Sequence, residues 1–482
     1  MPPPKPASPS PLTGPLLLLL AACFAATGAG AATLVIRGGR LFDPAAGVLR
    51  PVEAVVIEGD RIAAVVPAGQ PFTVPAGAGE LDARGRYLLP GLIDGHVHLV
   101  HILRSVHVTA DEIFPLYVAH GVTTVRDTGD EVVGQRLLAR SAEEHPGRSP
   151  RVFLASNLID GNPAYHQGVS WPVTDPALVP AYVDDMVAWG VQTFKLYVGT
   201  ERPVGQAVIR EAHRHGKWVT GHLGKYRVQD AVADGIDSIE HIDPVFEGLL
   251  PPDFPRLPPL AERLRMPRAD LVALRTRIFT LKNQIDFAAP PTRALLDLLV
   301  RHGTMVDPTL VVFRNWMLLS DQPEIQQHPD VALIPARLRR FWFDSLSRAG
   351  ADPETAALRR EHFTRLLQLT GELYRAGVPL MAGTDAPVQF CPPGAAMHQE
   401  LELLVEAGLP PAAALTAATL HNARALNQAP NLGSIEPGKL ADLVILDADP
   451  LADIRHTRRI HRVVRSGIVS APAELLRQVP AE

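Results

Sequence analysis

Cysteine is nearly absent from this chain, which has 482 residues and only two cysteines, Cys23 and Cys391. Cys23 lies in an N-terminal segment that we expect to be processed, so no disulfide can form within the fold. The folded chain must therefore be held together by its core. Hydrophobic residues make up 46% of the chain and charged residues 20%, so a large core is available and general disorder is not expected.

An excess of positive charge is also missing, since the formal net charge is −5. Proteins that bind nucleic acids usually carry a basic face. The composition therefore gives no support for a nucleic-acid partner, and we expect a small-molecule substrate instead. The sequence leaves the oligomeric state open, including a homo-oligomer.

Long hydrophobic runs are limited to the N-terminal segment. Residues 16–22 form an apolar run that follows Lys5 and is too short to span a bilayer as a stable helix. Leu20-Ala21-Ala22-Cys23 also resembles a bacterial lipobox, in which Cys23 would carry a lipid. We predict that residues 1–32 are a signal peptide or a lipoprotein leader. The protein would then be periplasmic or extracellular, with a lipid on Cys23 as its contact with the membrane.

Short strand-like runs occupy both ends of the remaining chain. Residues 33–37 and 61–66 are apolar runs bounded by turn signals, and residues 441–446 repeat the pattern near the C-terminus. We expect residues 33–88 and 430–472 to form one small composite β-sandwich domain.

Residues 89–429 alternate strand-like and helix-like segments, a pattern typical of a parallel sheet. The strand candidates are residues 88–99, 122–127, 151–157, 191–197, 218–223, 238–242, 304–310 and 379–386. Helix-like segments such as 181–189 and 204–215 lie between most of them. Eight such units predict an α/β fold with a (β/α)₈ TIM-like barrel rather than an open sheet.

Four histidines stand at the ends of three of these strands. His96 and His98 are two residues apart, so on a strand both rings point to the same face. His222 and His241 each end a later strand. One histidine alone is more often structural, but four on suitably placed strand ends predict a divalent metal site at the barrel mouth.

Lys195 and Asp385 complete the set of metal-ligand candidates. Lys195 lies mid-strand among apolar residues, where an ammonium group is costly unless it is paired or neutral. It is therefore either a salt-bridged or snorkelling lysine, or a lysine carboxylated by CO₂ that bridges two cations. Asp385 on the last strand is either a helix N-cap or a ligand and general base, and the other ligand candidates favour the second interpretation.

Several segments of the chain resemble the amidohydrolase superfamily, specifically its imidazolonepropionase-like and Xaa-Pro-dipeptidase-like branch. They are residues 90–98, 121–127, 238–241, 382–385 and 433–444. The resemblance implies two divalent ions, zinc by preference. His96, His98 and Asp385 would hold one ion, His222 and His241 the other, and carboxylated Lys195 would bridge them.

The chain also departs from these relatives near the fifth strand. Relatives often carry His-Ala-His there, whereas Thr220-Gly221-His222 supplies one histidine. Deaminases of the superfamily tend to place a glutamate three residues after this histidine. Lys225 stands there in this chain, which disfavours a deaminase.

We therefore expect metal-assisted hydrolysis of a C–N amide bond in a dipeptide or an N-acyl amino acid, by a hydroxide that bridges the ions, with Asp385 as the general base. Arg314 is a candidate for binding a substrate carboxylate, and Tyr197 for binding the scissile carbonyl. The alternatives are hydrolysis of a lactone, cyclic amide or phosphoester at the same site, or a non-catalytic cell-surface metal-binding protein.

Overall fold

The computed structural model describes residues 32–479, except 252, 256, 258, 259, 264, 320–322, 350–352 and 389. The predicted leader up to residue 31, with Cys23, lies outside the described residues, so the export of the protein stays a prediction. Within the described part of the chain, no helix combines the length and the apolarity needed to cross a membrane.

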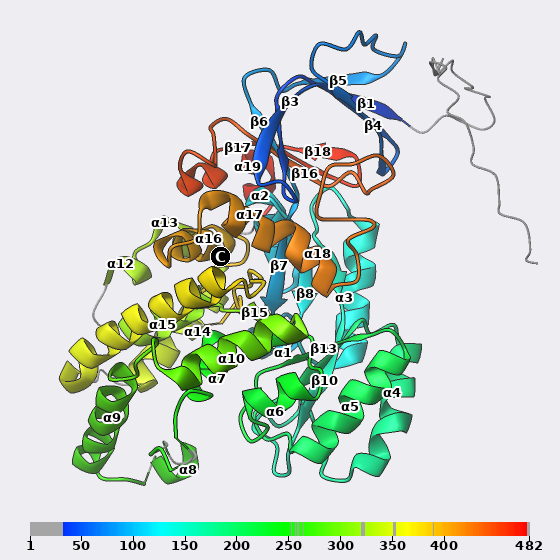
Figure 1. Cartoon of the computed structure of the whole chain (residues 1–482). Coiled ribbons are helices and arrows are strands. Elements are labelled where there is room, and N and C mark those ends of the chain that lie inside the picture. The colour runs from blue at the N-terminus through cyan, green and yellow to red at the C-terminus, as the bar shows by residue number, and fades with distance from the viewer. Residues whose placement is uncertain are drawn as a thin grey trace, which may run out of the picture.

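Strands from both ends of the chain share one curled sheet, which lies at the top of Figure 1. Its order is β18-β17-β16-β6-β2-β3-β1-β5, with β4 paired to β3. The strands are β1 Thr33–Arg37, β2 Arg40–Asp43, β3 Val48–Glu58, β4 Arg61–Pro67, β5 Gly79–Asp82, β6 Tyr87–Pro90, β16 Leu443–Leu446, β17 Ile460–Arg465 and β18 Ile468–Ser470. The two ends meet where β6 pairs antiparallel with β16, and Leu88 and Ile445 are both buried there.

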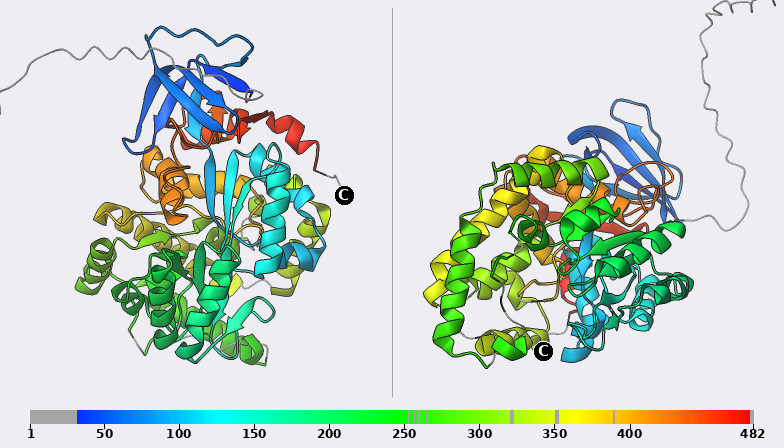
Figure 2. Two further views of the ribbon diagram at one scale, coloured as in Figure 1. Left: turned by 90° about the vertical axis from the view of Figure 1, so that its right-hand side faces the viewer. Right: turned by 60° about the horizontal axis from the view of Figure 1, so that its bottom comes forward.

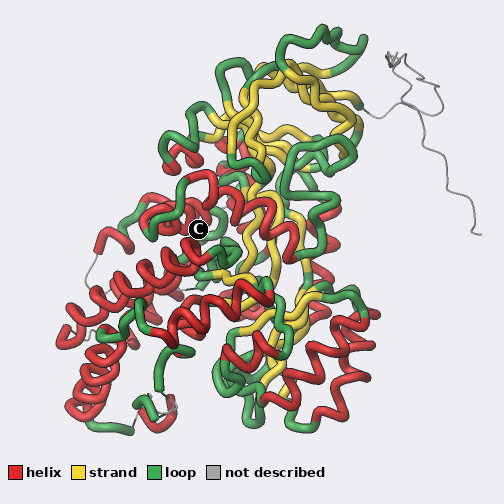
Figure 3. The backbone as a smooth tube through the Cα atoms, viewed as in Figure 1, coloured by secondary structure: helices red, strands yellow, loops and turns green. Residues whose placement is uncertain are grey.

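A parallel barrel follows the sheet in the middle of the chain (Figure 3). Its strands are β7 Leu92–Val97, β8 Val122–Asp127, β9 Arg151–Phe153, β10 Ala155–Asp160, β12 Thr193–Leu196, β13 Trp218–Gly221, β14 Ser238–Glu240 and β15 Met305–Asp307. A short strand, β11 Ser170–Pro172, pairs with β10 on its outer side. Bridges from Val306 to Leu380 and from Ala386 to Val97 close the ring. The predicted TIM-like barrel with an additional β domain is confirmed.

Three of the predicted strands are interrupted in the structure, and the predicted strands 238–242 and 304–310 end earlier, at Glu240 and Asp307. The predicted strand 88–99 is divided at Gly91 into β6 and β7, because a Cβ at Gly91 would overlap Thr123 Oγ1 where the chain enters the barrel. The predicted strand 151–157 is divided into β9 and β10. Residues 379–386 form isolated bridges and no continuous strand, since Gly383 packs against His96 and Asp385 adopts a φ of +59°.

Helices surround the barrel strands (Figure 2). They are α1 Val100–Val106, α2 Ala110–Ala119, α3 Val132–Glu144, α4 Val179–Ala188, α5 Arg202–Arg214, α6 Val228–Ala233, α7 Ile242–Glu247, α10 Pro290–His302, α11 Leu310–Leu318, α15 Ala356–Ala376, α16 Ala395–Glu406, α17 Pro411–Thr416 and α18 Asn422–Ala425. In α5 the buried Val204, Val208 and Ala212 recur every four residues, which turns one apolar stripe toward the strands.

The two long connections after β14 and β15 carry further helices. They are α8 Leu260–Arg263 and α9 Arg268–Asn283 after β14, and α12 Pro323–Gln326, α13 Pro329–Ala332 and α14 Ala336–Ala349 after β15. A last helix, α19 Pro472–Leu476, packs against α2.

The N-terminal end of β7 contacts the sheet through a hydrogen bond from Gly91 N to Asp442 O, so the C-terminal ends of the barrel strands point away from the sheet.

Gly467 provides a test of how the two chain ends hold each other. It has a φ of +77°, and a Cβ there would overlap the carbonyl oxygen of Gly59 in the β3–β4 turn. Gly467→Ala should lower the free energy of unfolding by at least about 2 kcal/mol, through the clash and the left-handed backbone.

The matched control is Gly438→Ala, because Gly438 has a φ of +88° but no atom within 4 Å of the position that a Cβ would take. This substitution should cost only about 1 kcal/mol. Guanidinium unfolding followed by circular dichroism measures both changes. Equal losses in the two variants would contradict the close contact between the chain ends.

Candidate metal centre

All six ligand candidates come together at the C-terminal ends of the barrel strands. The rings of His96 and His98 have centroids 5.2 Å apart, those of His96 and His241 4.7 Å, and those of His222 and His241 4.4 Å. Parallel strands place their carboxyl ends at one mouth, where barrel enzymes keep their reactive groups. The predicted histidine cluster therefore exists in the fold.

Asp385 joins this cluster from the segment that closes the barrel. Its Oδ1 atom lies 3.4 Å from His96 Nε2 and 3.2 Å from His98 Nε2, and the two Nε2 atoms are 3.3 Å apart. His241 also has a ligand atom within 4.8 Å of those of His96 and Asp385. Asp385 and His241 both have positive φ angles, +59° and +70°, a local strain that typically marks functional sites.

Glu240 orients the first histidine of the cluster. Its Oε2 atom lies 2.7 Å from His96 Nδ1, while Arg126 Nη2 donates to Oε1 at 2.5 Å and Thr220 Oγ1 donates to the same oxygen. Arg126 Nε also donates to Gly95 O at 2.6 Å, directly before His96. A carboxylate on Nδ1 fixes the imidazole and leaves Nε2 for a metal ion.

His241 is held in a similar way by a hydroxyl group. His241 Nδ1 and Thr309 Oγ1 form a hydrogen bond of 2.7 Å. Its Nε2 atom therefore remains for a ligand, as in His96.

Burial sets the protonation of the cluster. It lowers the pKa of His96 to about 4 and that of His222 to about 3, and the charge of Lys195 adds to both effects. Burial and the charge of His222 hold the pKa of His241 well below its usual value. Burial would raise the pKa of Asp385, but the hydrogen bond from His98 and the charges of the histidines lower it. Neutral imidazoles and an ionised carboxylate are the forms that bind divalent metals.

Lys195 lies on β12, where it is paired in register with Thr220 on β13. Its side chain is buried, and Nζ has no hydrogen-bond partner among the described residues. Burial lowers its pKa to about 8. Imidazole nitrogens, one carboxylate and a buried amine without a partner fit a divalent metal centre with room for one further ligand group.

The structure places the two substrate-binding candidates differently. The Tyr197 ring lies 5.2 Å from the His222 ring, and burial raises the pKa of Tyr197, so its hydroxyl stays protonated. Arg314 donates to Asn315 Oδ1 at 3.0 Å and to Gln399 Oε1, so its guanidinium is already paired with protein groups. The substrate roles of both residues stay predictions.

Several polar residues of the site were missed in the sequence. Glu240, Arg126, Thr220 and Asp307 are all fully buried at the strand ends. A charged residue inside an apolar strand was the signal that could have found Glu240, Arg126 and Asp307, whereas Thr220 gave no such signal. His96, Glu240 and Asp307 lie close enough together to form a second possible metal site. The oxygens of Glu240 already accept hydrogen bonds, however, so we assign Glu240 and Asp307 to the support of the histidine cluster.

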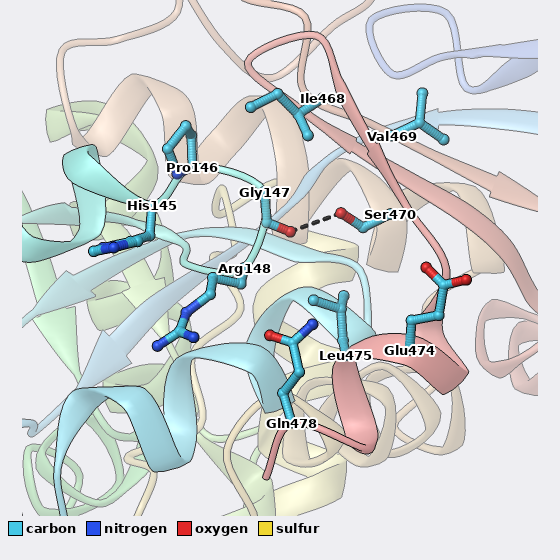
Figure 4. Close-up of a pocket in the computed structure, with 10 residues that line it drawn as sticks. All are labelled: His145, Pro146, Gly147, Arg148, Ile468, Val469, Ser470, Glu474, Leu475 and Gln478. Carbon is cyan, nitrogen blue, oxygen red and sulfur yellow. Dashed lines mark hydrogen bonds between the residues drawn. The ribbon is translucent and has the colours of Figure 1, made fainter.

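A cavity of about 370 Å³ lies elsewhere, between the loop after α3 and helix α19 (Figure 4). Its lining includes His145, Arg148, Ile468 and Glu474, and none of the six ligand candidates. Ser470 Oγ donates to Gly147 O at 2.7 Å across one side. This cavity has no part in the metal centre.

Glu240→Gln tests the support of His96. The amide would offer an NH₂ group or a weaker acceptor to His96 Nδ1, so metal affinity should fall by about 10- to 100-fold. Metal content after dialysis against graded chelator concentrations measures the change.

Glu112→Gln is the control for Glu240→Gln, because Glu112 is another buried glutamate that binds an arginine, Arg337, but lies on α2. Its metal affinity should equal that of the wild type. A Glu240→Gln protein with wild-type metal affinity would show that this carboxylate does not position the ligand.

Solved structures share the fold of this chain. A bottromycin amidohydrolase aligns over 92% of this chain and 88% of its own, with a TM-score of 0.69 and 24% identity. A Xaa-Pro dipeptidase with bound methionine aligns over 91% and 100%, with a TM-score of 0.63 and 21% identity. Phenylurea hydrolase B aligns over 92% and 97%, with a TM-score of 0.64 and 23% identity. Identities this low establish the fold alone.

Curated relatives match shorter stretches of the sequence. An adenine deaminase from Rubrobacter xylanophilus is 30% identical over 242 residues, which is 46% of this chain and 36% of that protein. A dihydroorotase from Geobacter sulfurreducens is 44% identical over 66 residues, 14% of this chain and 15% of that protein. The chain thus spans about a third or less of the length of these two relatives.

The model of the Amidohydrolase family matches residues 87–469, well over half of the chain. This range contains the barrel and all six ligand candidates, and members of the family generally use divalent metal ions. The chain belongs to the amidohydrolase family.

Proposed function

We propose that the protein is a metal-dependent hydrolase of C–N amide bonds. The observation that carries this proposal is the convergence of the Nε2 atoms of His96 and His98 on Asp385 Oδ1, with His241 alongside. Family membership supports hydrolysis, and the relatives of similar fold include a dipeptidase, an amidohydrolase and a phenylurea hydrolase.

The proposed site holds two divalent cations, zinc by preference. His96, His98 and Asp385 would bind one ion, and His222 and His241 the other. When bound, two such ions lower the pKa of water and polarise a carbonyl group.

Lys195 would lie between the ions as a carbamate. Its pKa of about 8 leaves part of the amine neutral near pH 7. The neutral amine would attack the carbon of CO₂: a C–N bond forms, one C=O π bond breaks to give the carbamate oxyanion, and the nitrogen releases a proton to solvent. This replaces a costly buried ammonium by an anion between cations.

Asp385 would move the proton in the reaction. Its lowered pKa keeps it ionised, so it can take a proton from the attacking water and deliver it to the nitrogen of the leaving amine. Tyr197, beside His222, would donate a hydrogen bond to the scissile carbonyl oxygen.

Deamination is the second candidate, since adenine deaminases are among the relatives. Lys225 argues against deamination, because it occupies the position where deaminases of the superfamily tend to place a glutamate. Its side chain is exposed and lies 3.5 Å from Glu201. Hydrolysis of a lactone, cyclic amide or phosphoester remains an alternative for the same site. A substrate panel with zinc-loaded protein, adenine included, separates these reactions. Bound metal without turnover would favour a binding protein.

Asp385→Asn tests the proton transfer. The side chain is nearly isosteric, so the fold should persist while kcat falls by about 10²- to 10⁴-fold. The test measures kcat on the best amide found in the panel, with metal content determined on the same sample. Asp442→Asn, directly before β16 and far from the cluster in the β domain, is the control and should keep kcat. Unchanged metal content with near-normal kcat in Asp385→Asn would place the general base elsewhere.

Lys195→Ala tests the bridge between the ions. Metal content should drop from two ions toward one or none, because the shared anionic ligand is removed. Bicarbonate with a short-chain carboxylic acid should partly restore the second ion. Lys439→Ala, which removes a buried lysine bound to Ser434, should leave metal content unchanged. Two retained ions in Lys195→Ala would rule out the bridging role.

A further inference from the structure

Aromatic rings continue outward from the histidine cluster along α11. This helix begins directly after β15 and Thr309, and the Phe313 ring lies 5.9 Å from the His241 ring. The Trp316 ring follows at 6.5 Å from Phe313. Trp316 is 54% exposed although its neighbours Asn315 and Met317 are buried. The helix therefore presents one exposed indole ring that is two ring contacts away from His241.

A second set of rings comes from the loop between β10 and β11. The Tyr165 ring is 6.0 Å from the Tyr197 ring, which is 5.2 Å from that of His222. Tyr165 N donates to Asp160 Oδ2 at 2.6 Å, and Asp160 also accepts a hydrogen bond from Gly199 N at 2.7 Å. This buried carboxylate anchors the loop, yet the Tyr165 side chain is 64% exposed.

We call Tyr165, Tyr197, Phe313 and Trp316 the aromatic rim. Large exposed rings carry apolar surface that water solvates poorly, and an aromatic side chain has few rotatable bonds, so it loses little entropy when a ligand stacks on it. Because the ring contacts lead from His222 and His241 to exposed rings on separate elements, the rim is suited to a flat group next to the metal centre.

Apart from Lys195, the arginine and lysine side chains described near the cluster are already bound to protein groups. Arg126 is buried and binds Glu240. Lys282 Nζ lies 3.3 Å from Asp243 and 3.5 Å from Glu247. Arg314 donates hydrogen bonds to Asn315 and Gln399. A substrate carboxylate would have to break one of these interactions, so the side chains give it little support.

We propose that the aromatic rim binds an aromatic group of a neutral amide, and that amides with a free carboxylate on the leaving group are poor substrates. This inference rests on the proposed amide hydrolysis and narrows its substrate class. It replaces the expectation of a dipeptide carboxylate held by Arg314.

The kinetic test uses N-acetylglycine anilide, its 4-carboxyanilide and N-acetylglycine methylamide. The carboxyanilide has the better leaving group, so a lower kcat/KM for it than for the anilide would reflect binding. Trp316→Ala should lower kcat/KM about threefold to tenfold for the anilide and less than about twofold for the methylamide, because only the anilide has a ring to stack.

Trp316→Phe should restore most of the loss, since it keeps a ring. Trp189→Ala is the matched control, because Trp189 is 46% exposed and lies just after α4. Trp189→Ala should change kcat/KM for neither the anilide nor the methylamide. Equal effects of Trp316→Ala on the anilide and the methylamide, or a wild-type preference for the carboxyanilide, would overturn the proposal.

A binding measurement separates this proposal from the proposed reaction. Benzohydroxamate and acetohydroxamate both chelate zinc, and only the first carries a ring. In calorimetry on zinc-loaded protein, benzohydroxamate should bind about tenfold more tightly than acetohydroxamate, and Trp316→Ala should reduce this ratio at least about threefold. If benzohydroxamate binds about tenfold more tightly but no amide is turned over, the proposed reaction is rejected and the proposed binding by the aromatic rim is kept. Turnover without a difference between the hydroxamates would reject the rim alone.

Discussion

The carboxylate of Glu240 joins four strands of the barrel at one point, and the geometry of the metal centre depends on it. Glu240 follows from β14, His96 from β7, Arg126 from β8 and Thr220 from β13, and all four side chains are buried. An isolated carboxylate in this interior would be very costly, so it is tolerated because each oxygen accepts hydrogen bonds. Removing one partner would leave a buried charge uncompensated and should cost several kcal/mol, about 3–5 in comparable cases. The same group thus fixes both the strand ends and the ring of the first ligand.

This pairing also explains why Lys195 is available for chemistry. Arg126 and Thr220 both bind Oε1 of Glu240, and His96 occupies Oε2. Among the described residues Lys195 therefore has no hydrogen-bond partner, although Glu240, Asp385 and Asp307 all favour its charged form. Burial outweighs these charges and lowers its pKa to about 8. Had Glu240 paired with Lys195 instead of Arg126, the amine would have stayed a firmly bound ammonium.

The sequence predicted the barrel and the ligand cluster well because both depend on short-range regularities. His96 and His98 share a face through the alternation of a strand, and equivalent ends of parallel strands meet wherever the barrel closes. The breaks in the strands were not predictable in this way. Gly91 and Gly383 mark points where the backbone approaches Thr123 and His96, and such contacts exist only after the strands have assembled.

Arg314 illustrates a different limit of the sequence. Successive residues of a helix point about 100° apart, so the phase of α11 decides which residue faces His241. Phe313 does so, and Arg314 therefore faces Gln399 on α16. The sequence showed a cation after the seventh strand but not the rotation of the helix that carries it. Glu240 was visible beside His241, yet its bond to His96 joins residues 144 positions apart and follows only from the closed barrel.

The ligand candidates and the exposed rings of the aromatic rim lie on different βα units. The ligand candidates occupy strand ends that are tied together by Glu240 and Asp385, whereas Trp316 lies on the helix after β15 and Tyr165 on the loop after β10. A change at Trp316 removes an exposed ring without disturbing a buried hydrogen bond, so the proposed substrate contact can change while the ligand candidates stay in place. A change at Glu240 disturbs four strands at once. This separation gives a physical reason why one metal-binding barrel can serve many substrates, and why the fold alone does not identify the substrate.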